Sequence, residues 1–256
     1  MKVNTVNVNG IDVAYVRRGA GKPLVLIHGF PLEHTLWNET ASLLVNDFDL
    51  ILPDLRGFGE SATVESPYGM SDMADDLAGL LDHLEIEKTS IAGHSMGGYV
   101  ALAFAQKFQQ RISGLGLVSS QAAADAPEGR AKRYQTAQDV GEKGVGVVAD
   151  AMTAKLSADA GVQAFVRRMM ERQKPSAVIG ALKAMAERDD STPLLSTFEL
   201  PLVLLHGDAD ALIPVGRARD IKSILPTARL VELHGAGHLP MIEFPQKTAE
   251  ALKLLK

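Results

Sequence analysis

The chain has 256 residues and a formal net charge of −5, from 26 lysines and arginines against 31 aspartates and glutamates. A chain of this length buries most of its unfolded surface without disulfides or a structural metal. It contains no cysteine, which excludes disulfide frameworks, thiolate zinc sites and cysteine nucleophiles.

The charge pattern and the apolar runs exclude two further classes of partner. The basic residues form no long run or stripe that could follow a phosphate backbone, so we do not expect nucleic acid to bind. No apolar run approaches the length of a membrane span, and residues 1–10 lack the pattern of a leader. We therefore expect a cytoplasmic protein without a membrane partner.

The first part of the chain predicts a hairpin and then alternating strands and helices. Residues 3–8 and 11–16 alternate polar and apolar side chains around Asn9-Gly10, two residues that tolerate positive φ. Short apolar runs, typical of strands buried on both faces, follow at 24–27, 50–52 and 89–92. Helical patterns cover 37–45, 71–83 with Ser71 as its N-cap, and 100–108.

The second part predicts a helical insertion followed by the rest of the sheet. Strands are expected at 112–119, 200–205 and 229–233, and a last helix at 245–255. Between them, helix-like segments without a buried strand occupy 128–140, 145–156, 160–172 and 176–188, broken at Gly141, Gly144, Ser157 and Lys174-Pro175. We expect an α/β core domain (1–121 and 193–256), with a mostly parallel sheet of about eight strands covered by helices on both faces. A small helical cap, or lid, is expected at 122–192.

One stretch has the pattern of a nucleophile elbow. Gly93, Ser95 and Gly97 stand between a buried strand and an alanine-rich helix. In a Gly-x-Ser-x-Gly turn the small residues permit strained backbone geometry, which holds the serine Oγ out at the carboxyl end of the sheet. A glycine-softened turn without chemistry would show the same five residues, so the interpretation depends on other segments.

Two later strands end in motifs that offer a base and a carboxylate. Residues 206–210 read His-Gly-Asp-Ala-Asp, and residues 234–238 read His-Gly-Ala-Gly-His. A serine needs a base to become a nucleophile at neutral pH, and the base needs a carboxylate that orients it. The order serine, acid, histidine along the chain is that of one class of serine hydrolase.

These motifs, together with residues 28–31 (His-Gly-Phe-Pro) and 54–61 (Asp-Leu-Arg-Gly-Phe-Gly-Glu-Ser), resemble the α/β-hydrolase superfamily. The similarity covers most of the chain and is to the branch of small serine carboxylesterases, lactonases and non-heme perhydrolases. It implies that Ser95 is the nucleophile, His238 the general base and then acid, and Asp210 the orienting carboxylate of a catalytic triad.

The same resemblance decides between two acids and implies an oxyanion hole. In similar sequences the acid stands three residues past the glycine and four before the proline, which is Asp210, whereas Asp208 is expected to accept from backbone donors. The backbone N–H groups of Phe30 and Met96 would form the oxyanion hole. Residues 122–192 fall where the family inserts its lid helices.

Four apolar side chains are candidates for a substrate pocket: Trp37, Met152, Met169 and Met185. Methionine adapts to apolar groups of varied shape, which suits an acyl pocket. Ordinary packing of the cap helices onto the core would place methionines at the same positions. For Trp37, a pocket wall and a helix-packing position fit equally well.

Several polar residues near the motifs have structural interpretations. Four other histidines beside motif glycines, His28, His94, His206 and His234, are expected to brace loops, and none of these four is assigned a catalytic role. Asp54 and Arg56 are expected to pair with each other under the site, and His34 and His83 to be solvated.

A serine at the elbow implies acyl transfer through an ester intermediate. We expect a carboxylesterase of small carboxylic esters with neutral acyl groups, with perhydrolysis as a side activity because Pro31 follows the oxyanion residue. Alternatives with the same triad are a lactonase and a C–C bond hydrolase, and a non-catalytic ligand receptor on the same fold is a further one. Epoxide hydrolases and haloalkane dehalogenases attack with an aspartate, so Ser95 argues against both.

No cofactor and no metal are expected. The histidines do not pair with carboxylates at metal-ligand spacing, and Pro31 lacks the N–H that a phosphate-binding turn would need. The expected partner is a small-molecule ester, and the sequence leaves the oligomeric state open.

Overall fold

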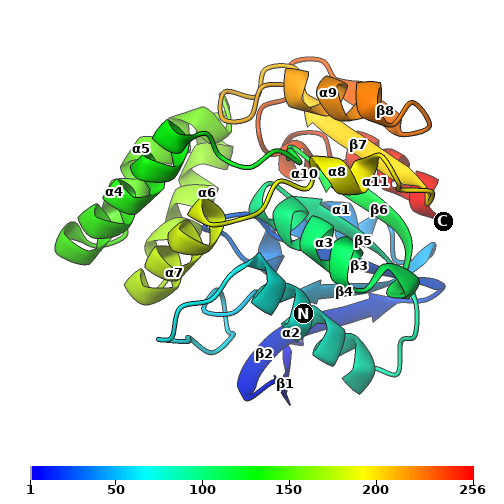
Figure 1. Cartoon of the computed structure of the whole chain (residues 1–256), viewed down its shortest axis with the longest axis horizontal. Coiled ribbons are helices and arrows are strands. Elements are labelled where there is room, and N and C mark those ends of the chain that lie inside the picture. Colours follow the sequence, from blue (N-terminus) through cyan, green and yellow to red (C-terminus); the bar gives the residue numbers. More distant parts are fainter. Residues whose placement is uncertain (1) are drawn as a thin grey trace.

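The computed structural model describes residues 2–256 and contains one eight-stranded sheet in the order β1-β2-β4-β3-β5-β6-β7-β8 (Figure 1). Strands β3 to β8 run parallel to one another, whereas β2 is antiparallel to both β1 and β4. The predicted α/β fold with a mostly parallel sheet is therefore confirmed. The strands are β1 (Asn4–Val8), β2 (Ile11–Gly19), β3 (Lys22–Ile27), β4 (Phe48–Pro53), β5 (Thr89–His94), β6 (Ile112–Val118), β7 (Leu202–Gly207) and β8 (Arg229–Leu233).

The N-terminal hairpin turns at the two residues that the sequence indicates. Val6 pairs with Val13, and Val8 with Ile11. Asn9 and Gly10 have φ values of 53° and 79°, which is the left-handed region that these two residues tolerate best.

Helices cover both faces of the sheet. Alternate residues of each central strand point to opposite sides, so Val25 packs in one hydrophobic cluster while Leu24 packs in the other. The Val25 side is covered by α2 (Met70–His83), α3 (Met96–Lys107) and α9 (Gly216–Ile224), and the Leu24 side by η1 (His34–Trp37), α1 (Asn38–Ser42) and α11 (Pro245–Leu252). The short elements η2 (Gln109–Arg111), α8 (Thr192–Leu195), α10 (Pro240–Glu243) and η3 (Lys253–Leu255) lie in the connections.

Four helices follow β6 and form a group beside the sheet, on the left in Figure 1. Ala122 precedes the first of these helices and Ser191 follows the last. The Ser191 N–H donates to the Ala122 carbonyl at 3.0 Å. Both residues lie at the limits predicted for the cap, 122–192, whose independence as a domain stays a prediction. The helices are α4 (Pro127–Lys143), α5 (Gly146–Leu156), α6 (Ala160–Glu171) and α7 (Pro175–Ala186).

Two predicted helix limits are wrong in an instructive way. Helix α2 begins one residue before Ser71, with Gly69 as its N-cap, and the Asp72 carboxylate accepts from the Gly69 N–H at 2.7 Å. The acid three residues into the helix, instead of the serine, satisfies the free end of the helix. Helix α4 continues through Gly141 and ends at Lys143, with Gly144 as its C-cap at a φ of 82°, which side chains disfavour.

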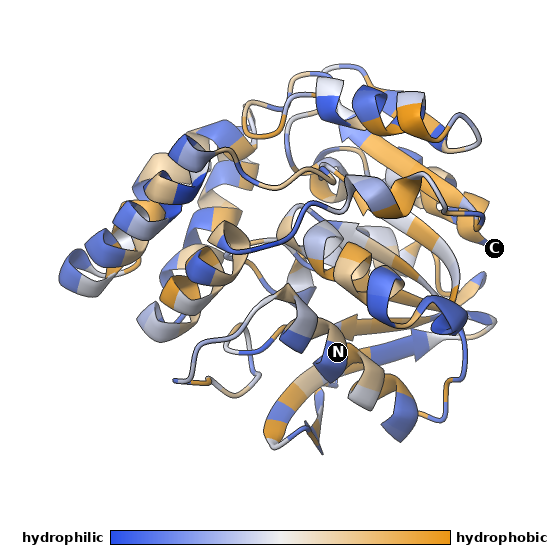
Figure 2. Ribbon diagram, viewed as in Figure 1, coloured by the Kyte–Doolittle hydropathy of each residue, from blue (hydrophilic) through white to orange (hydrophobic). Residues whose placement is uncertain are grey.

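Hydropathy follows the layers. Figure 2 shows hydrophobic residues along the strands of the sheet and hydrophilic residues along α4. Within residues 2–256, none of the helices combines the length and the apolar character needed to cross a membrane. The same residues contain no group of three or more histidines and acids arranged to hold a metal ion.

Candidate active site

Ser95 occupies the sharp turn between β5 and α3, with φ 50° and ψ −115°. Its N–H donates to the Val118 carbonyl at 2.9 Å, and its carbonyl accepts from the Gly98 N–H and the Ser120 hydroxyl at 2.9 and 2.8 Å. A non-glycine residue held in this region of backbone space costs about 1–3 kcal/mol. The hydrogen bonds of the turn hold that geometry against the strain.

The glycines of the turn are required by close backbone contacts. A Cβ added to Gly93 would lie 2.1 Å from the Gly97 carbonyl oxygen, and one added to Gly97 would lie 2.6 Å from the His28 carbonyl oxygen. Strand β5 can therefore approach helix α3 because Gly93 lacks a side chain, and α3 can lie against the end of β3 because Gly97 lacks one.

His238 lies in the loop after β8 and is fixed by three contacts. Its Nδ1 is 2.7 Å from Asp210 Oδ2, its N–H donates to the Leu156 carbonyl at 2.9 Å, and its own carbonyl accepts from His94 Nε2 at 2.9 Å. Because a carboxylate only accepts, Nδ1 carries the proton and Nε2 is left as the basic nitrogen.

Asp210 is buried and bonded on both oxygens. Oδ1 accepts from the N–H groups of Leu212 and Ile213 at 2.9 and 3.0 Å, and Oδ2 accepts from His238, with His206 Nε2 at 3.4 Å. Burial raises the pKa of Asp210, but the hydrogen bonds from His206 and His238 outweigh it, so that pKa falls well below the usual value. The carboxylate is thus charged across the neutral range.

The rival acid Asp208 lies elsewhere. Its carboxylate accepts from His234 Nδ1 at 2.8 Å and from the Gly235 N–H at 2.7 Å, and the His234 side chain is fully exposed. It braces the loop after β8, as expected, while Asp210 is the acid in contact with His238.

Ser95 and His238 line one cavity of about 360 Å³ at the carboxyl ends of the strands. Phe30, after β3, also lines it, and Met96 is the first residue of α3, where helix N–H groups lack an intrahelical acceptor. Within residues 2–256 no hydrogen bond joins the Ser95 hydroxyl to the His238 ring. Other residues of its wall come from the predicted cap, with Thr136, Val148, Ala151 and Leu182, and from the loop after β7, with Leu212 and Ile213.

The structure brings two of the four proposed pocket residues to this cavity. Met152 on α5 and Met185 on α7 line it. Trp37 and Met169 do not line it, because both are buried in the hydrophobic cluster that contains Leu24. Both positions are therefore core positions.

The sequence reasoning missed three basic side chains in the cavity wall: Lys132, Arg133 and Lys155. The first two lie on α4 and the third in the last turn of α5. Helical periodicity places residues on a face of a helix, but it does not tell which face of a largely polar helix turns toward the core.

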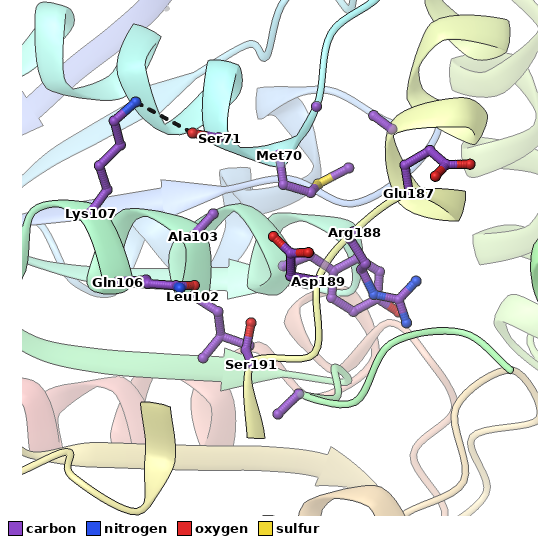
Figure 3. Close-up of a pocket in the computed structure, with 14 residues that line it drawn as sticks. Met70, Ser71, Leu102, Ala103, Gln106, Lys107, Glu187, Arg188, Asp189 and Ser191 are labelled. Atoms are coloured by element: carbon purple, nitrogen blue, oxygen red, sulfur yellow. Dashed lines mark hydrogen bonds between the residues drawn. The ribbon is translucent and has the colours of Figure 1, made fainter. Parts of the chain in front are cut away.

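A second cavity, of about 380 Å³, lies next to the first and shares Tyr99 with it (Figure 3). Arg188 stacks on the Tyr99 ring, with its guanidinium carbon 4.1 Å from the ring centre. Basic and acidic side chains are balanced in this wall, with Lys107 and Arg188 against Glu187 and Asp189.

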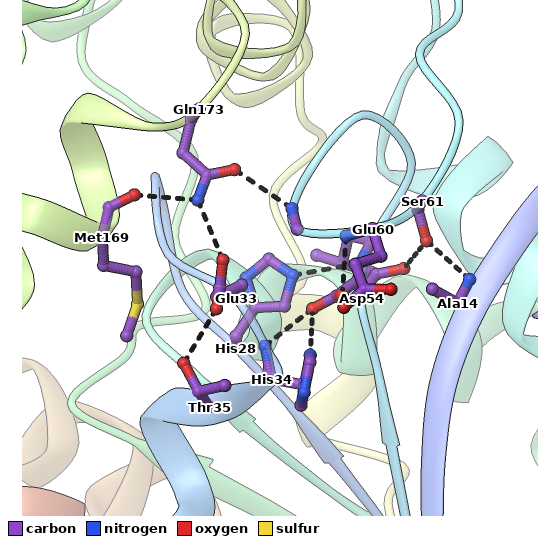
Figure 4. A network of polar contacts seen from close by, with 12 residues as sticks. Ala14, His28, Glu33, His34, Thr35, Asp54, Glu60, Ser61, Met169 and Gln173 are labelled. Atoms are coloured by element: carbon purple, nitrogen blue, oxygen red, sulfur yellow. Dashed lines mark hydrogen bonds and ion pairs between the residues drawn. The ribbon is translucent and has the colours of Figure 1, made fainter. Parts of the chain in front are cut away.

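A buried polar network joins the cap to the core (Figure 4). The Asp54 carboxylate accepts from His34 Nδ1 at 2.9 Å, and Gln173 after α6 donates to Glu33 and accepts from the Gly59 N–H at 3.0 Å. His34 is only 5% exposed, so its predicted solvation is wrong.

The predicted pairing of Asp54 with Arg56 is also wrong. The Arg56 guanidinium pairs with Asp76 on α2, from Nε to Oδ2 at 2.7 Å. The side chains of Asp54 and Arg56 project to different neighbours, because two residues separated by one position in an extended loop need not share a partner.

Comparison with known proteins identifies the fold family. The profile of the family described as "alpha/beta hydrolase fold" matches residues 22–245. A thermophilic esterase from Thermogutta terrifontis, solved with malate bound, is 38% identical and has a TM-score of 0.93, with 99% of this chain and 96% of that one covered. The pimeloyl-[acyl-carrier protein] methyl ester esterase of Nitrosomonas europaea is 29% identical over 243 residues, covering 90% of this chain and 93% of that relative.

A more distant structure agrees in fold. The enol-lactonase from Burkholderia xenovorans is 23% identical, with a TM-score of 0.90 over 98% of this chain and 99% of that one. The family match over residues 22–245 includes the turn at Ser95, both Asp208 and Asp210, and the loop that holds His238. The chain belongs to the alpha/beta hydrolase fold family.

Proposed function

We propose that the protein is a serine hydrolase of small carboxylic esters, a carboxylesterase that acts through an acyl-enzyme intermediate. The observation that carries the proposal is the 2.7 Å contact between His238 Nδ1 and Asp210, in a cavity that the strained Ser95 also lines. This arrangement supplies a nucleophile, an oriented base and a charged partner for the base.

The first half of the reaction forms the acyl-enzyme. Ser95 Oγ attacks the ester carbonyl carbon while its proton passes to His238 Nε2, and the charge of Asp210 stabilises the resulting imidazolium. The tetrahedral oxyanion receives hydrogen bonds from the N–H groups of Phe30 and Met96. The C–O bond to the alcohol then breaks, and His238 returns the proton to the leaving alkoxide.

The second half regenerates the serine. His238 takes a proton from water, which attacks the acyl carbon. When the second tetrahedral species collapses, the bond to Ser95 Oγ breaks, His238 returns the proton to that oxygen, and the acid is released. Before substrate binds, the contact between serine and base in such sites is commonly long or poorly aligned, and it tightens in the reacting complex. The missing hydrogen bond to the Ser95 hydroxyl is compatible with this behaviour.

The relatives support hydrolysis of an ester bond. Both the Thermogutta protein and the Nitrosomonas protein are called esterases, and both align along most of the chain. We assign residues 122–192 to a cap whose helices α4, α5 and α7 close the cavity over the reacting atoms, which excludes water and selects the acyl group.

Hydrolysis of p-nitrophenyl acetate tests the proposal. We expect multiple turnovers by the wild type and a loss of about a millionfold in kcat for Ser95→Ala, because removal of the nucleophile disables the whole triad. Ser113→Ala, on β6 and in contact with Ser90 instead of the cavity, is the matched control and should retain its rate. Equal rates in wild type and Ser95→Ala would overturn the proposal, and stoichiometric release without turnover would favour a ligand receptor.

A further inference from the structure

The cavity that Ser95 and His238 line carries an excess of positive charge. Lys132, Arg133 and Lys155 line it, against one carboxylate, Asp125. The chain as a whole has a net charge of −5, so this wall has the opposite sign to the molecule around it. The adjacent cavity in Figure 3 has balanced charges, so of these two cavities only the one that Ser95 and His238 line has the excess.

The single carboxylate is already neutralised. Asp125 pairs with Arg133 Nε on one oxygen and with Arg188 Nη2 on the other, the latter at 2.9 Å. These hydrogen bonds outweigh burial, which raises its pKa, so the pKa of Asp125 lies below its usual value and the acid stays charged. Arg133 is further fixed by a contact of 3.2 Å from Nη1 to Met185 Sδ.

The two lysines remain available to a ligand. Lys132 on α4 and Lys155 at the end of α5 are exposed side chains that reach the cavity wall. Among residues 2–256, neither forms an ion pair with a carboxylate. Two flexible ammonium groups at the rim of an apolar cavity would attract an anion that the apolar floor does not bind.

We propose that the preferred substrates are esters whose acyl half ends in a carboxylate, that is, monoesters of dicarboxylic acids. The ester carbonyl lies between Ser95 and the oxyanion donors, the methylene chain packs on Met152 and Met185, and the terminal carboxylate lies between Lys132 and Lys155. This inference rests on the proposed esterase function. It replaces the neutral acyl group expected from the sequence, where these cations appear as scattered residues.

The test compares two methyl esters of equal chain length, methyl hexanoate and monomethyl adipate, with methanol release as the readout. We expect kcat/KM to be at least about tenfold higher for the half-ester in wild type, as is reasonable for attraction to two charged side chains. The ratio should fall toward one in the double variant Lys132→Gln, Lys155→Gln. It should also fall when the salt concentration is raised to about 1 M, where the screening length is about 3 Å.

The matched control removes the same charge from the cap away from the cavity. Lys143 on α4 and Lys183 on α7 are exposed and do not line it, so Lys143→Gln, Lys183→Gln should keep the wild-type ratio. A wild-type ratio of one or less, or a ratio unchanged in Lys132→Gln, Lys155→Gln, would overturn the charge proposal while the esterase function stands. Failure of both methyl esters and of p-nitrophenyl acetate to turn over would instead overturn the esterase function itself.

Discussion

At the scale of single residues, Asp210 combines two tasks. One oxygen holds the backbone of its own turn through Leu212 and Ile213, and the other accepts from His238. An amide at this position could still accept the backbone hydrogen bonds, but it would present no negative charge to an imidazolium. Turn geometry and electrostatic support of the base can therefore be separated by one substitution.

We expect Asp210→Asn to fold normally and to lose about 10⁴-fold in kcat, because the histidine would lose its charged partner and its correct tautomer. Steady-state hydrolysis of p-nitrophenyl acetate measures the loss, and thermal unfolding measures the fold. Asp208→Asn is the comparison and should change kcat by less than about tenfold, since Asp208 contacts only the exposed His234 and the loop. A larger loss in Asp208→Asn than in Asp210→Asn would reverse the assignment.

The buried pair His34–Asp54 predicts a pH window for stability. Burial lowers the pKa of His34, but its hydrogen bond to Asp54 outweighs burial and raises that pKa. Burial raises the pKa of Asp54, and the hydrogen bond from His34 outweighs burial and lowers it. The contribution of Asp54 to the free energy of unfolding is fully present above the pKa of an unfolded aspartate, near 4, and is lost as the pH falls further. The contribution of His34 is fully present below the pKa of an unfolded histidine, about 6.5, and is lost as the pH rises.

His34→Ala should therefore lower the free energy of unfolding most between about pH 4 and pH 6.5, by about 2 kcal/mol for a charged hydrogen bond. The difference in free energy of unfolding between His34→Ala and wild type should shrink toward about pH 9, because the pH then rises above the raised pKa of His34. Urea unfolding at several pH values measures it. His83→Ala, at an exposed position on α2, is the control, and a constant difference at all pH values for His34→Ala would contradict the prediction.

At the scale of elements, the histidine loop is fastened to the end of α5. Glu243 on α10 accepts from the Gly237 N–H at 2.8 Å and from the Ser157 hydroxyl, directly after α5. The His238 N–H also donates to Leu156, the last residue of α5. The helix that carries Met152 and Lys155 into the cavity wall thus also contacts the loop that holds His238.

We expect Glu243→Ala to lower kcat by about 100-fold with little change in KM, because small displacements of a catalytic group are costly. Glu243→Gln should recover most of the rate, since a glutamine can accept from Gly237 and donate to Ser157. Glu33→Ala, which removes an acid that ties the cap to the core at another point, should leave kcat near wild type. The prediction would be contradicted if kcat did not recover in Glu243→Gln, or if Glu33→Ala lowered kcat as much as Glu243→Ala. Either result would mean that kcat depends on attachment of the cap in general.

Elements were predictable where the signal is local, and side-chain partners were not. The strand 229–233 has the predicted limits and the hairpin turns at the predicted residues Asn9-Gly10, because runs of apolar residues and turn residues act within a few positions. Trp37 and His34 are buried by segments distant in sequence, so no local pattern reveals their surroundings. The triad candidates were found because each follows a strand end with characteristic glycines.

At the scale of the whole molecule, one group of polar contacts joins residues 122–192 to the core at Gln173 and Arg172. Gln173 bridges the Gly59 loop, Glu33 and the Met169 carbonyl (Figure 4). Arg172 also pairs with Glu33. These bonds lie at the junction of α6 and α7.

We expect Gln173→Ala to speed amide hydrogen exchange in α6 and α7 by about tenfold, the equivalent of one or two hydrogen bonds, with β5 and β6 unchanged. Hydrogen exchange followed by mass spectrometry measures both regions in one experiment. Gln138→Ala, which removes an exposed contact to Glu142 on α4, should leave both rates as in wild type. Equal acceleration in the sheet would mean that cap and core open together.

The hydrogen bond from Ser191 to Ala122 has a consequence for how such enzymes diversify. An insertion whose two ends meet can be exchanged for another of different size without pulling on the strands that carry the reacting groups. Evolution can then change the range of substrates by exchanging one contiguous segment, while the residues at the strand ends stay the same.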